Sequence, residues 1–479
     1  MITILHISDL HRDSGSALTT ESLLESLRLD RERYRAQHRI PDVAIVSGDI
    51  VLGVTSNDGD SDVALNRQYE EAKHFLVRLA DLFFNGNRER VVIVPGNHDV
   101  SHPHVLRATA IETIPTDSDK RAILARQLNS DGSPWRWVWT DFSLRRIADA
   151  ALYAQRLQPF ADFYSAFYEK RRIFSLDPAE QFGVHDFPDL GIVVAGLSSC
   201  CDNDLFNRSG RIHPSCVAGV TRAVAEPLRR GRIAIATWHH NLAGGPRDSD
   251  YVDADFLQSL LDGGFSIGLH GHQHRPQFLE HRFTANRQRA IAVVSSGTLC
   301  GGPRSLPSGR RRAYNLVTIN PELRSGTLVV REMKNDGFSS PVWGEAYVTE
   351  FGGASIQFDL SLPAVAEPSI QIAAEAAELL RKGDIAGALA LARPLATDPL
   401  ARRVAIEAFV QLADWQGIKE FCTPPQSSTE IVALCDALYL LGDKAALKVL
   451  VSSDEIARNT DVAVRQSVEQ AHARLGRPR

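Results

Sequence analysis

The first hundred residues alternate between short, continuous apolar runs and longer amphipathic stretches. The apolar runs lie at 4–7, where His6 is the one polar residue, at 43–46 and at 91–94, and the amphipathic stretches lie at 19–37 and 65–84. A short apolar run rich in β-branched residues is typical of a strand buried on both faces, whereas apolar residues at helical spacing among charges indicate an amphipathic helix. The pattern therefore predicts strand, helix, strand, helix and strand in succession, which is the organisation of a parallel sheet.

A similar pattern returns in the second part of the chain. Strand-like apolar or alternating runs lie at 191–197, 232–238, 266–270, 290–295, 314–320, 326–333 and 342–348, and a helical pattern lies at 253–262. Two β-rich halves predict a sandwich of two sheets. Residues 101–186 interrupt the rhythm, and we interpret them as a helical insertion with aromatic clusters at 135–139 and 160–168. Aromatic stripes of this kind usually serve as packing mass rather than as platforms for stacking bases.

Beyond residue 360 the composition changes. Residues 361–368 include two prolines and two alanines, a composition that indicates a linker. Residues 369–479 are rich in alanine and leucine and are predicted to be helical. Similar short motifs near 383, 414 and 442 indicate a degenerate helical-hairpin repeat of roughly thirty residues. The segment 373–399 resembles a tetratricopeptide unit, with a plain helical bundle as the alternative. Because such arrays usually bind proteins or self-associate, we expect a protein partner or self-association through 369–479.

Composition and charge narrow the class of protein. The chain has 479 residues, 44% of them hydrophobic and 23% charged, which is ordinary for a globular protein with more than one domain. A net charge of −5 does not indicate a protein that binds nucleic acid over its whole surface. The start of the chain does not resemble a signal peptide, and no apolar run approaches the roughly 20 residues that span a bilayer. With six cysteines that lack metal-type spacing, we expect a cytoplasmic protein with reduced thiols and no membrane contact.

Polar side chains of the kinds that bind metals follow five of the predicted strands. The clusters are Asp9-x-His11, Gly48-Asp49, Gly96-Asn97-His98-Asp99, His239-His240 and Gly271-His272-x-His274. In parallel sheets, ligands gather at the carboxyl ends of strands, so these residues are expected to lie close together. Mixed carboxylate, amide and imidazole groups suit Mn²⁺, Fe or Zn²⁺ better than Ca²⁺. The set is too large for one tetrahedral site, and it therefore predicts two metal ions.

This ordered set of motifs resembles that of the calcineurin-like metallophosphoesterase family over about residues 1–335. The resemblance implies a four-layer α/β/β/α sandwich, here a domain over 1–360 that carries the insertion 101–186, and a site for two divalent metals, of which we favour Mn²⁺. Carried over from the family, Asp9, His11 and His274 would hold the first metal, and Asn97, His239 and His272 would hold the second. Asp49 would bridge both.

Other polar residues at the predicted site are not assigned as metal ligands. His98 is left outside the ligand set, so it is free to donate a proton to the leaving group, and Asp99 is expected to orient it. His240 is expected either to support the metal ligands from behind or to face the substrate, and Thr298 is expected to line the site and contact the substrate. His6, further back in the first strand, stays outside the site.

The function predicted from these residues is hydrolysis of a phosphoester by metal-activated hydroxide. We favour a phosphodiester of a nucleotide or nucleic acid, so that the protein would be a phosphodiesterase or nuclease. A phosphomonoesterase or protein phosphatase is the alternative within the same chemistry. A scaffold with a vestigial site, acting through its helical repeats, is the alternative of another class, although no cluster lacks its ligand-type residues.

Overall fold

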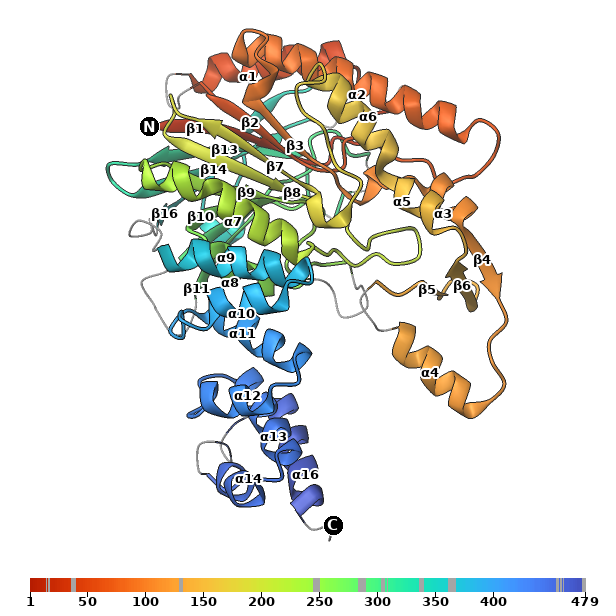
Figure 1. Ribbon diagram of the computed structural model, residues 1–479. Helices are drawn as coiled ribbons and strands as arrows, with labels where there is room; N and C mark the ends of the chain where they lie inside the picture. The colour runs from red at the N-terminus through yellow and green to blue at the C-terminus, as the bar shows by residue number, and fades with distance from the viewer. Residues whose placement is uncertain are drawn as a thin grey trace. The chain divides into compact units, whose positions relative to one another are not determined.

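A computed structural model gives the fold of the chain (Figure 1). It describes residues 1–475 except 14, 16–17, 36–39, 129–131, 244–249, 283–289, 303–305, 308, 336–339, 361–367, 454–455, 457–458 and 460. The chain divides into two compact units, Met1–Val365 and Ala366–Arg479. The predicted linker, 361–368, lies outside the described residues except for Pro368.

The first unit contains a seven-stranded sheet in the order β15-β14-β13-β1-β2-β3, with β16 also paired to β14. Its strands are β1 (Ile2–Ile7), β2 (Val43–Ser47), β3 (Val91–Val94), β13 (Ala313–Asn320), β14 (Ser325–Met333), β15 (Trp343–Glu345) and β16 (Ser355–Asp359). β1, β2 and β3 are parallel neighbours, as the opening apolar runs predict, and β13 pairs with β1 in the antiparallel direction.

A six-stranded sheet in the order β11-β12-β10-β9-β8-β7 forms the second layer of strands. Its strands are β7 (Phe182–Phe187), β8 (Ile192–Leu197), β9 (Ile233–Thr237), β10 (Phe265–His270), β11 (Gln277–Arg282) and β12 (Ala290–Ser295). The four central strands are parallel, and β7 and β11 are antiparallel edges.

The two sheets pack face to face. One apolar core joins Ile4 and Ile45 of the first sheet to Val194, Ile235 and Leu269 of the second, all of them buried. A second core lies between the first sheet and the helices α1 (Thr20–Tyr34), α2 (Ser61–Phe84) and α6 (Gln158–Phe167), and Figure 1 shows α1 and α2 above the strands. The helices α7 (Pro214–Arg229) and α8 (Asp255–Asp262) contact the second sheet. This is the predicted four-layer α/β/β/α sandwich.

The insertion is not wholly helical, which corrects the prediction. Its elements are α3 (His102–Ala108), β4 (Thr109–Glu112), α4 (Ser118–Leu128), β5 (Trp135–Val138), β6 (Ser143–Ile147) and α5 (Ala150–Ala154), followed by α6. The three strands form a small antiparallel sheet in the order β4-β6-β5. The physical reason is that Trp135–Val138 contains aromatic and β-branched residues, which favour strands. The aromatic stripe of α6 is buried in the core, and its role is packing.

The second unit is helical, as predicted. Within its described residues, the helices are α9 (Pro368–Arg381), α10 (Ile385–Ala392), α11 (Pro399–Gln411), α12 (Trp415–Phe421), α13 (Ser428–Leu440), α14 (Lys444–Val451) and α16 (Val462–Leu475). Asp384, Asp414 and Asp443 each cap the second helix of a pair by accepting a hydrogen bond from the amide three residues later. A tetratricopeptide-like repeat stays a prediction. Over the described part of the whole chain, no helix combines the length and apolarity needed to cross a membrane.

Candidate metal centre

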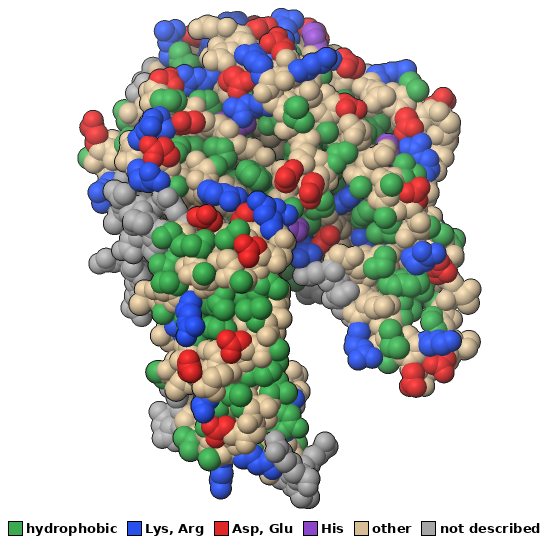
Figure 2. All heavy atoms as spheres, viewed as in Figure 1, with side chains coloured by type: hydrophobic (Ala, Val, Ile, Leu, Met, Phe, Trp, Pro, Cys, Tyr) green, Lys and Arg blue, Asp and Glu red, His purple; other side chains and the backbone are tan. Residues whose placement is uncertain are grey.

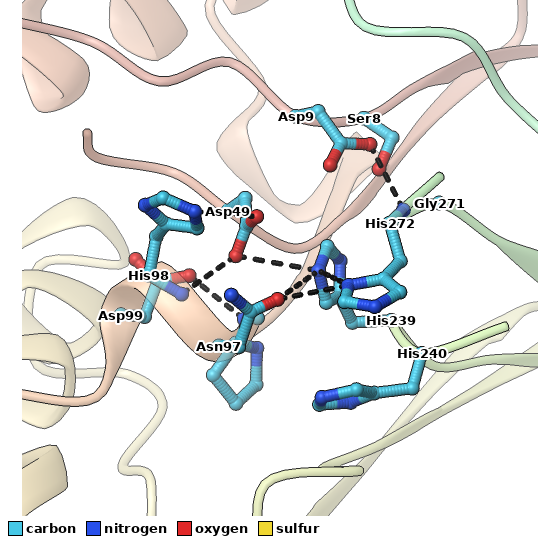
Figure 3. A network of polar contacts seen from close by, with 12 residues as sticks. Ser8, Asp9, Asp49, Asn97, His98, Asp99, His239, His240, Gly271 and His272 are labelled. Atoms are coloured by element: carbon cyan, nitrogen blue, oxygen red, sulfur yellow. Dashed lines mark hydrogen bonds and ion pairs between the residues drawn. The ribbon is translucent and has the colours of Figure 1, made fainter. Parts of the chain in front are cut away.

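The five polar clusters meet where strands of both sheets end at the same edge. Figure 3 shows residues that follow β1, β2 and β3 of the first sheet facing residues that follow β9 and β10 of the second. The two halves are joined there, because the amide of His272 donates a hydrogen bond to Oδ2 of Asp9 over 3.1 Å. Residues far apart in the sequence are thus brought into one cluster, here called the pocket, whose carboxylates are buried and whose His98 is partly exposed.

The backbone at this edge is held in an uncommon conformation. Asp9, His11, Asp49, His272 and His274 have φ values of 52°, 43°, 51°, 82° and 53°, in the left-handed region. Such backbone costs on the order of 1–3 kcal/mol per residue and persists where the surroundings hold it, typically at functional sites. Here the amide of Asp9 donates to Gly48 O over 3.0 Å, and the amide of His11 donates to Asp49 O over 3.0 Å.

One group of side chains surrounds Asp9. Nε2 of His274 lies 3.2 Å from Oδ1 of Asp9 and 3.0 Å from Nε2 of His11. The same His11 atom lies 3.9 Å from Oδ2 of Asp49. Asp9, His11 and His274 are buried and offer one carboxylate and two imidazoles at ligand-like separations.

A second group lies on the other side of Asp49. Nε2 of His239 lies 3.3 Å from Oδ1 of Asp49 and 3.1 Å from Oδ1 of Asn97. Nδ1 of His272 lies 2.9 Å from that Asn97 oxygen and 3.3 Å from Nε2 of His239. Asp49 therefore faces both groups, with Oδ1 toward the second group and Oδ2 toward His11.

The close approach of the loops to Asp49 requires a glycine. A Cβ atom at Gly96 would lie 2.2 Å from Oδ1 of Asp49 and 2.4 Å from its backbone nitrogen. The glycine before Asn97 is therefore needed so that the third strand's loop can reach the shared carboxylate.

The electrostatics of the pocket favour a cation. Asp9 and Asp49 are almost fully buried, and within the described residues their ion-pair partners are histidines rather than lysine or arginine. Burial opposes ionisation of Asp9, but the neighbouring His274 holds the pKa of Asp9 below its ordinary value. Burial lowers the pKa of His239, but Asp49 outweighs it and raises that pKa to about 9. Two buried carboxylates with imidazole and amide donors fit divalent first-row metals.

Ser47 supports the second group in a way that the sequence motifs do not indicate. Nδ1 of His239 lies 2.7 Å from the backbone oxygen of Ser47, the last residue of β2. A carbonyl can only accept, so Nδ1 carries a proton, and Nε2, which is directed at Asp49 and Asn97, is the nitrogen that can bind a metal once it has lost its own proton.

His98 lies at the exposed side of the pocket. Its Nδ1 lies 2.6 Å from Leu52 O, and its Nε2 lies 3.9 Å from Oδ2 of Asp49. The His98 side chain is 39% exposed, whereas that of Asp49 is 2% exposed. His98 thus combines a ring orientation fixed by a backbone carbonyl with access to solvent.

Asp99 does not contact the His98 ring, which corrects the expectation that it orients that ring. Oδ2 of Asp99 accepts hydrogen bonds from the amides of Gly96 (2.8 Å) and Ile50 (3.1 Å), and Oδ1 accepts one from the Tyr69 hydroxyl (3.2 Å). Burial and the charge of Asp49 raise the pKa of Asp99 to about 7. Asp99 therefore ties together the loops that carry Asp49 and Asn97.

His240 lies behind the ligand His272, which is one of its two expected positions, whereas Thr298 does not face a substrate as expected. His240 is fully buried, its Nδ1 lies 2.8 Å from Ser199 Oγ, and its Nε2 accepts from Asn203 Nδ2 over 3.3 Å. Thr298 is buried, donates to Asp9 O and accepts from the Gly301 amide. Neither side chain has a polar atom left to meet a substrate, so both support the pocket instead.

His6 stays outside the pocket, where its Nε2 forms a hydrogen bond of 2.9 Å with Ser47 Oγ.

The family model for calcineurin-like phosphoesterases matches residues 2–276, a span that contains both groups of ligand-type side chains. The chain belongs to this family. It is accordingly a dimetal phosphoesterase, a metal-dependent hydrolase of phosphoesters.

Two solved structures are similar to the phosphoesterase at low sequence identity. A dimetal phosphatase from Danio rerio is 10% identical, with a TM-score of 0.34 over 71% of this chain and 98% of that one. The calcineurin-like phosphoesterase YfkN from Bacillus subtilis is 11% identical, with a TM-score of 0.30 over 81% of this chain and 98% of that one. No curated protein matches the phosphoesterase. The assignment therefore rests on the family model and on the residues of the pocket.

Proposed function

We propose that this phosphoesterase hydrolyses phosphodiesters of nucleotides or nucleic acids with two divalent metal ions, Mn²⁺ being favoured. The observation that carries the proposal is the pair of ligand-type groups that share Asp49 beside the exposed His98. The proposed ligands of the first metal are Asp9, His11, Asp49 and His274, and those of the second are Asp49, Asn97, His239 and His272.

The bound metals would supply an activated water and would offset negative charge on the phosphoryl oxygens. The residues of the chain then have distinct roles. Asp49 holds the two groups in register, and the contact between Nδ1 of His239 and the carbonyl of Ser47 directs Nε2 of His239 at Asp49 and Asn97. His98 in its doubly protonated form donates the proton on Nε2 to the leaving oxygen, while its Nδ1–H donates to Leu52 O and holds the ring in place.

The charge of the pocket supports a diester over a monoester. A monoester is largely dianionic at neutral pH, and cationic side chains beside the metals would help to bind it. Among the described residues, the ion pairs of Asp9 and Asp49 are with histidines, and no lysine or arginine reaches them. A diester carries a single negative charge and needs less compensation.

A substrate panel tests this proposal. The full-length chain is assayed with Mn²⁺ or with a chelator against bis-p-nitrophenyl phosphate, p-nitrophenyl phosphate, cyclic nucleotides, single- and double-stranded DNA, and RNA. We expect Mn²⁺-dependent cleavage of the diesters to exceed that of the monoester. Faster cleavage of the monoester would indicate a phosphomonoesterase, and cleavage of none of them together with no metal binding would indicate a scaffold.

We also propose that the C-terminal unit binds a protein partner or a second copy. Figure 2 shows apolar side chains among the charged ones on its surface, and Leu440 and Val449 are 52% and 74% exposed. The molar mass in solution, measured by light scattering with and without residues 369–479, tests self-association. If the chain were monomeric both with and without these residues, self-association would be excluded, and only binding of a different protein would remain proposed.

A further inference from the structure

The ring of His272 presents its two nitrogens to different surroundings. Nδ1 lies among the proposed ligands, 2.9 Å from Asn97 Oδ1 and 3.3 Å from His239 Nε2, as Figure 3 shows. Nε2 points the other way and lies 3.5 Å from Oδ2 of Asp250. The ring therefore stands between the metal pocket and a carboxylate that belongs to none of the motifs.

In the described part of the chain, each of the two residues has one buried polar atom without a hydrogen-bond partner, and on Asp250 this atom is the oxygen further from His272. Within the described residues, Nε2 of His272 and Oδ1 of Asp250 are buried atoms without a hydrogen-bond partner. The 3.5 Å separation is slightly longer than a usual hydrogen bond, and a small rotation of either side chain would close it. Buried polar groups are rarely left unpaired, and because rotation of a carboxylate exchanges its two oxygens, either oxygen of Asp250 can accept from Nε2 of His272.

The backbone next to Asp250 is fixed against the end of β9. Tyr251 O accepts a hydrogen bond from the Gly210 amide over 3.0 Å, and the Val252 amide donates to Asn241 O over 2.8 Å. Asn241 directly follows His239 and His240, so the segment that carries Asp250 is held by the same strand end that supplies a proposed ligand. Asp250 is thereby kept in reach of His272.

We propose that Asp250 is a positioning residue that holds His272 as a ligand of the second metal. A carboxylate at Nε2 keeps the proton on that nitrogen and leaves the lone pair of Nδ1 directed at the pocket. Such a partner also makes the imidazole a stronger donor, and losing it typically weakens metal binding by about 10- to 100-fold. The inference rests on the proposed metal role of His272 and extends it to a residue outside the family's motifs.

Calorimetric titration of Mn²⁺ into the metal-free, full-length chain tests this role without any substrate. We expect Asp250→Ala to weaken one of two binding phases by about 10- to 100-fold and to leave the other unchanged. Asp250→Asn, which keeps an acceptor oxygen but loses the charge, is expected to fall between Asp250→Ala and the wild type. Asp253→Asn removes the same charge from an exposed position of the same segment and should leave both phases unchanged.

A double-mutant cycle separates positioning from a general effect on the fold. His272→Ala is expected to remove the sensitive phase, and adding Asp250→Ala to it should then have no further effect. Equal binding by wild type, Asp250→Asn and Asp250→Ala would overturn the inference, as would an equal loss in both phases. A wild-type chain that bound no Mn²⁺ would overturn it together with the metal site. If the wild type bound two Mn²⁺ but cleaved no phosphoester, only the proposed function would fail.

Discussion

Replacing His98 tests whether it is the proton donor, because the loss of rate caused by the substitution should then depend on how basic the leaving group is. The ring is held by the 2.6 Å contact between Nδ1 and Leu52 O, and Nε2 is the nitrogen nearer to Asp49, at 3.9 Å from its Oδ2. His98→Gln removes the ring, and with it the proton on Nε2, while the proposed ligands remain. We therefore expect slower chemistry with unchanged metal binding.

The size of the effect follows from the position of the ring. General acids contribute about 10²- to 10⁴-fold to a rate, which corresponds to about 2.7–5.5 kcal/mol of transition-state stabilisation. The His98 side chain is 39% exposed, so water can partly replace it as a proton source. We therefore expect the lower half of that range, about 10²- to 10³-fold in kcat, when the leaving group is an alkoxide such as a nucleoside hydroxyl.

A comparison of two diester substrates provides the assay. p-Nitrophenolate leaves without being protonated, so His98→Gln should slow hydrolysis of bis-p-nitrophenyl phosphate by about tenfold or less. Hydrolysis of a dinucleotide should slow by the full amount, about 10²- to 10³-fold. His74→Gln, at a surface histidine that is 49% exposed, is the control and should leave both rates unchanged. An equal loss with both substrates would refute the proton-donor role. Loss of a bound metal would instead make His98 a ligand with His11 and Asp49, a combination that the distances permit.

Four further predictions concern the pocket and the second unit. Gly96→Ala should weaken Mn²⁺ binding measured by calorimetry, because its Cβ would lie 2.2 Å from Oδ1 of Asp49; unchanged binding would contradict the close packing described. Chelation should lower the unfolding temperature of the first unit, since a ligand at 100 times its Kd stabilises a fold by about 2.7 kcal/mol; an unchanged temperature would count against a metal that stabilises the fold. Arg402→Ala should destabilise the second unit by about 3–5 kcal/mol in thermal melts, because it leaves the buried carboxylate of Glu430 without its cation, whereas Arg403→Ala, at an exposed position, should not. Burial raises the pKa of Glu430, but the hydrogen bond from Arg402 outweighs burial and lowers that pKa. The stabilisation by this pair should therefore be present above the ordinary pKa of glutamate and fade as the pH falls below that value. If wild type and Arg402→Ala lost stability equally in acid, this expectation would be contradicted.

The sandwich and the convergence of the clusters could be predicted from the sequence because topology carries that information. Parallel strands end at one edge, so residues that follow Ile7, Ser47 and Val94 must lie near each other whatever the loops between them do. The strands of the insertion were harder to predict, because Trp135–Val138 is too short for the spacing of its apolar residues to distinguish a strand from a helix. The supporting residues were harder still. Asp250 follows no strand and belongs to no motif, and the roles of His240 and Thr298 depend on side-chain directions that only the packed structure fixes.

The central claim is that two metal ions share Asp49, and anomalous diffraction from crystals grown with Mn²⁺ measures this directly. We predict two anomalous peaks about 3.5–4 Å apart, the spacing of dimetal hydrolase sites. One peak should lie beside Asp9, His11 and His274, and the other beside Asn97, His239 and His272, with the Asp49 carboxylate between them. A single peak, or two peaks of which one does not contact Asp49, would contradict the account.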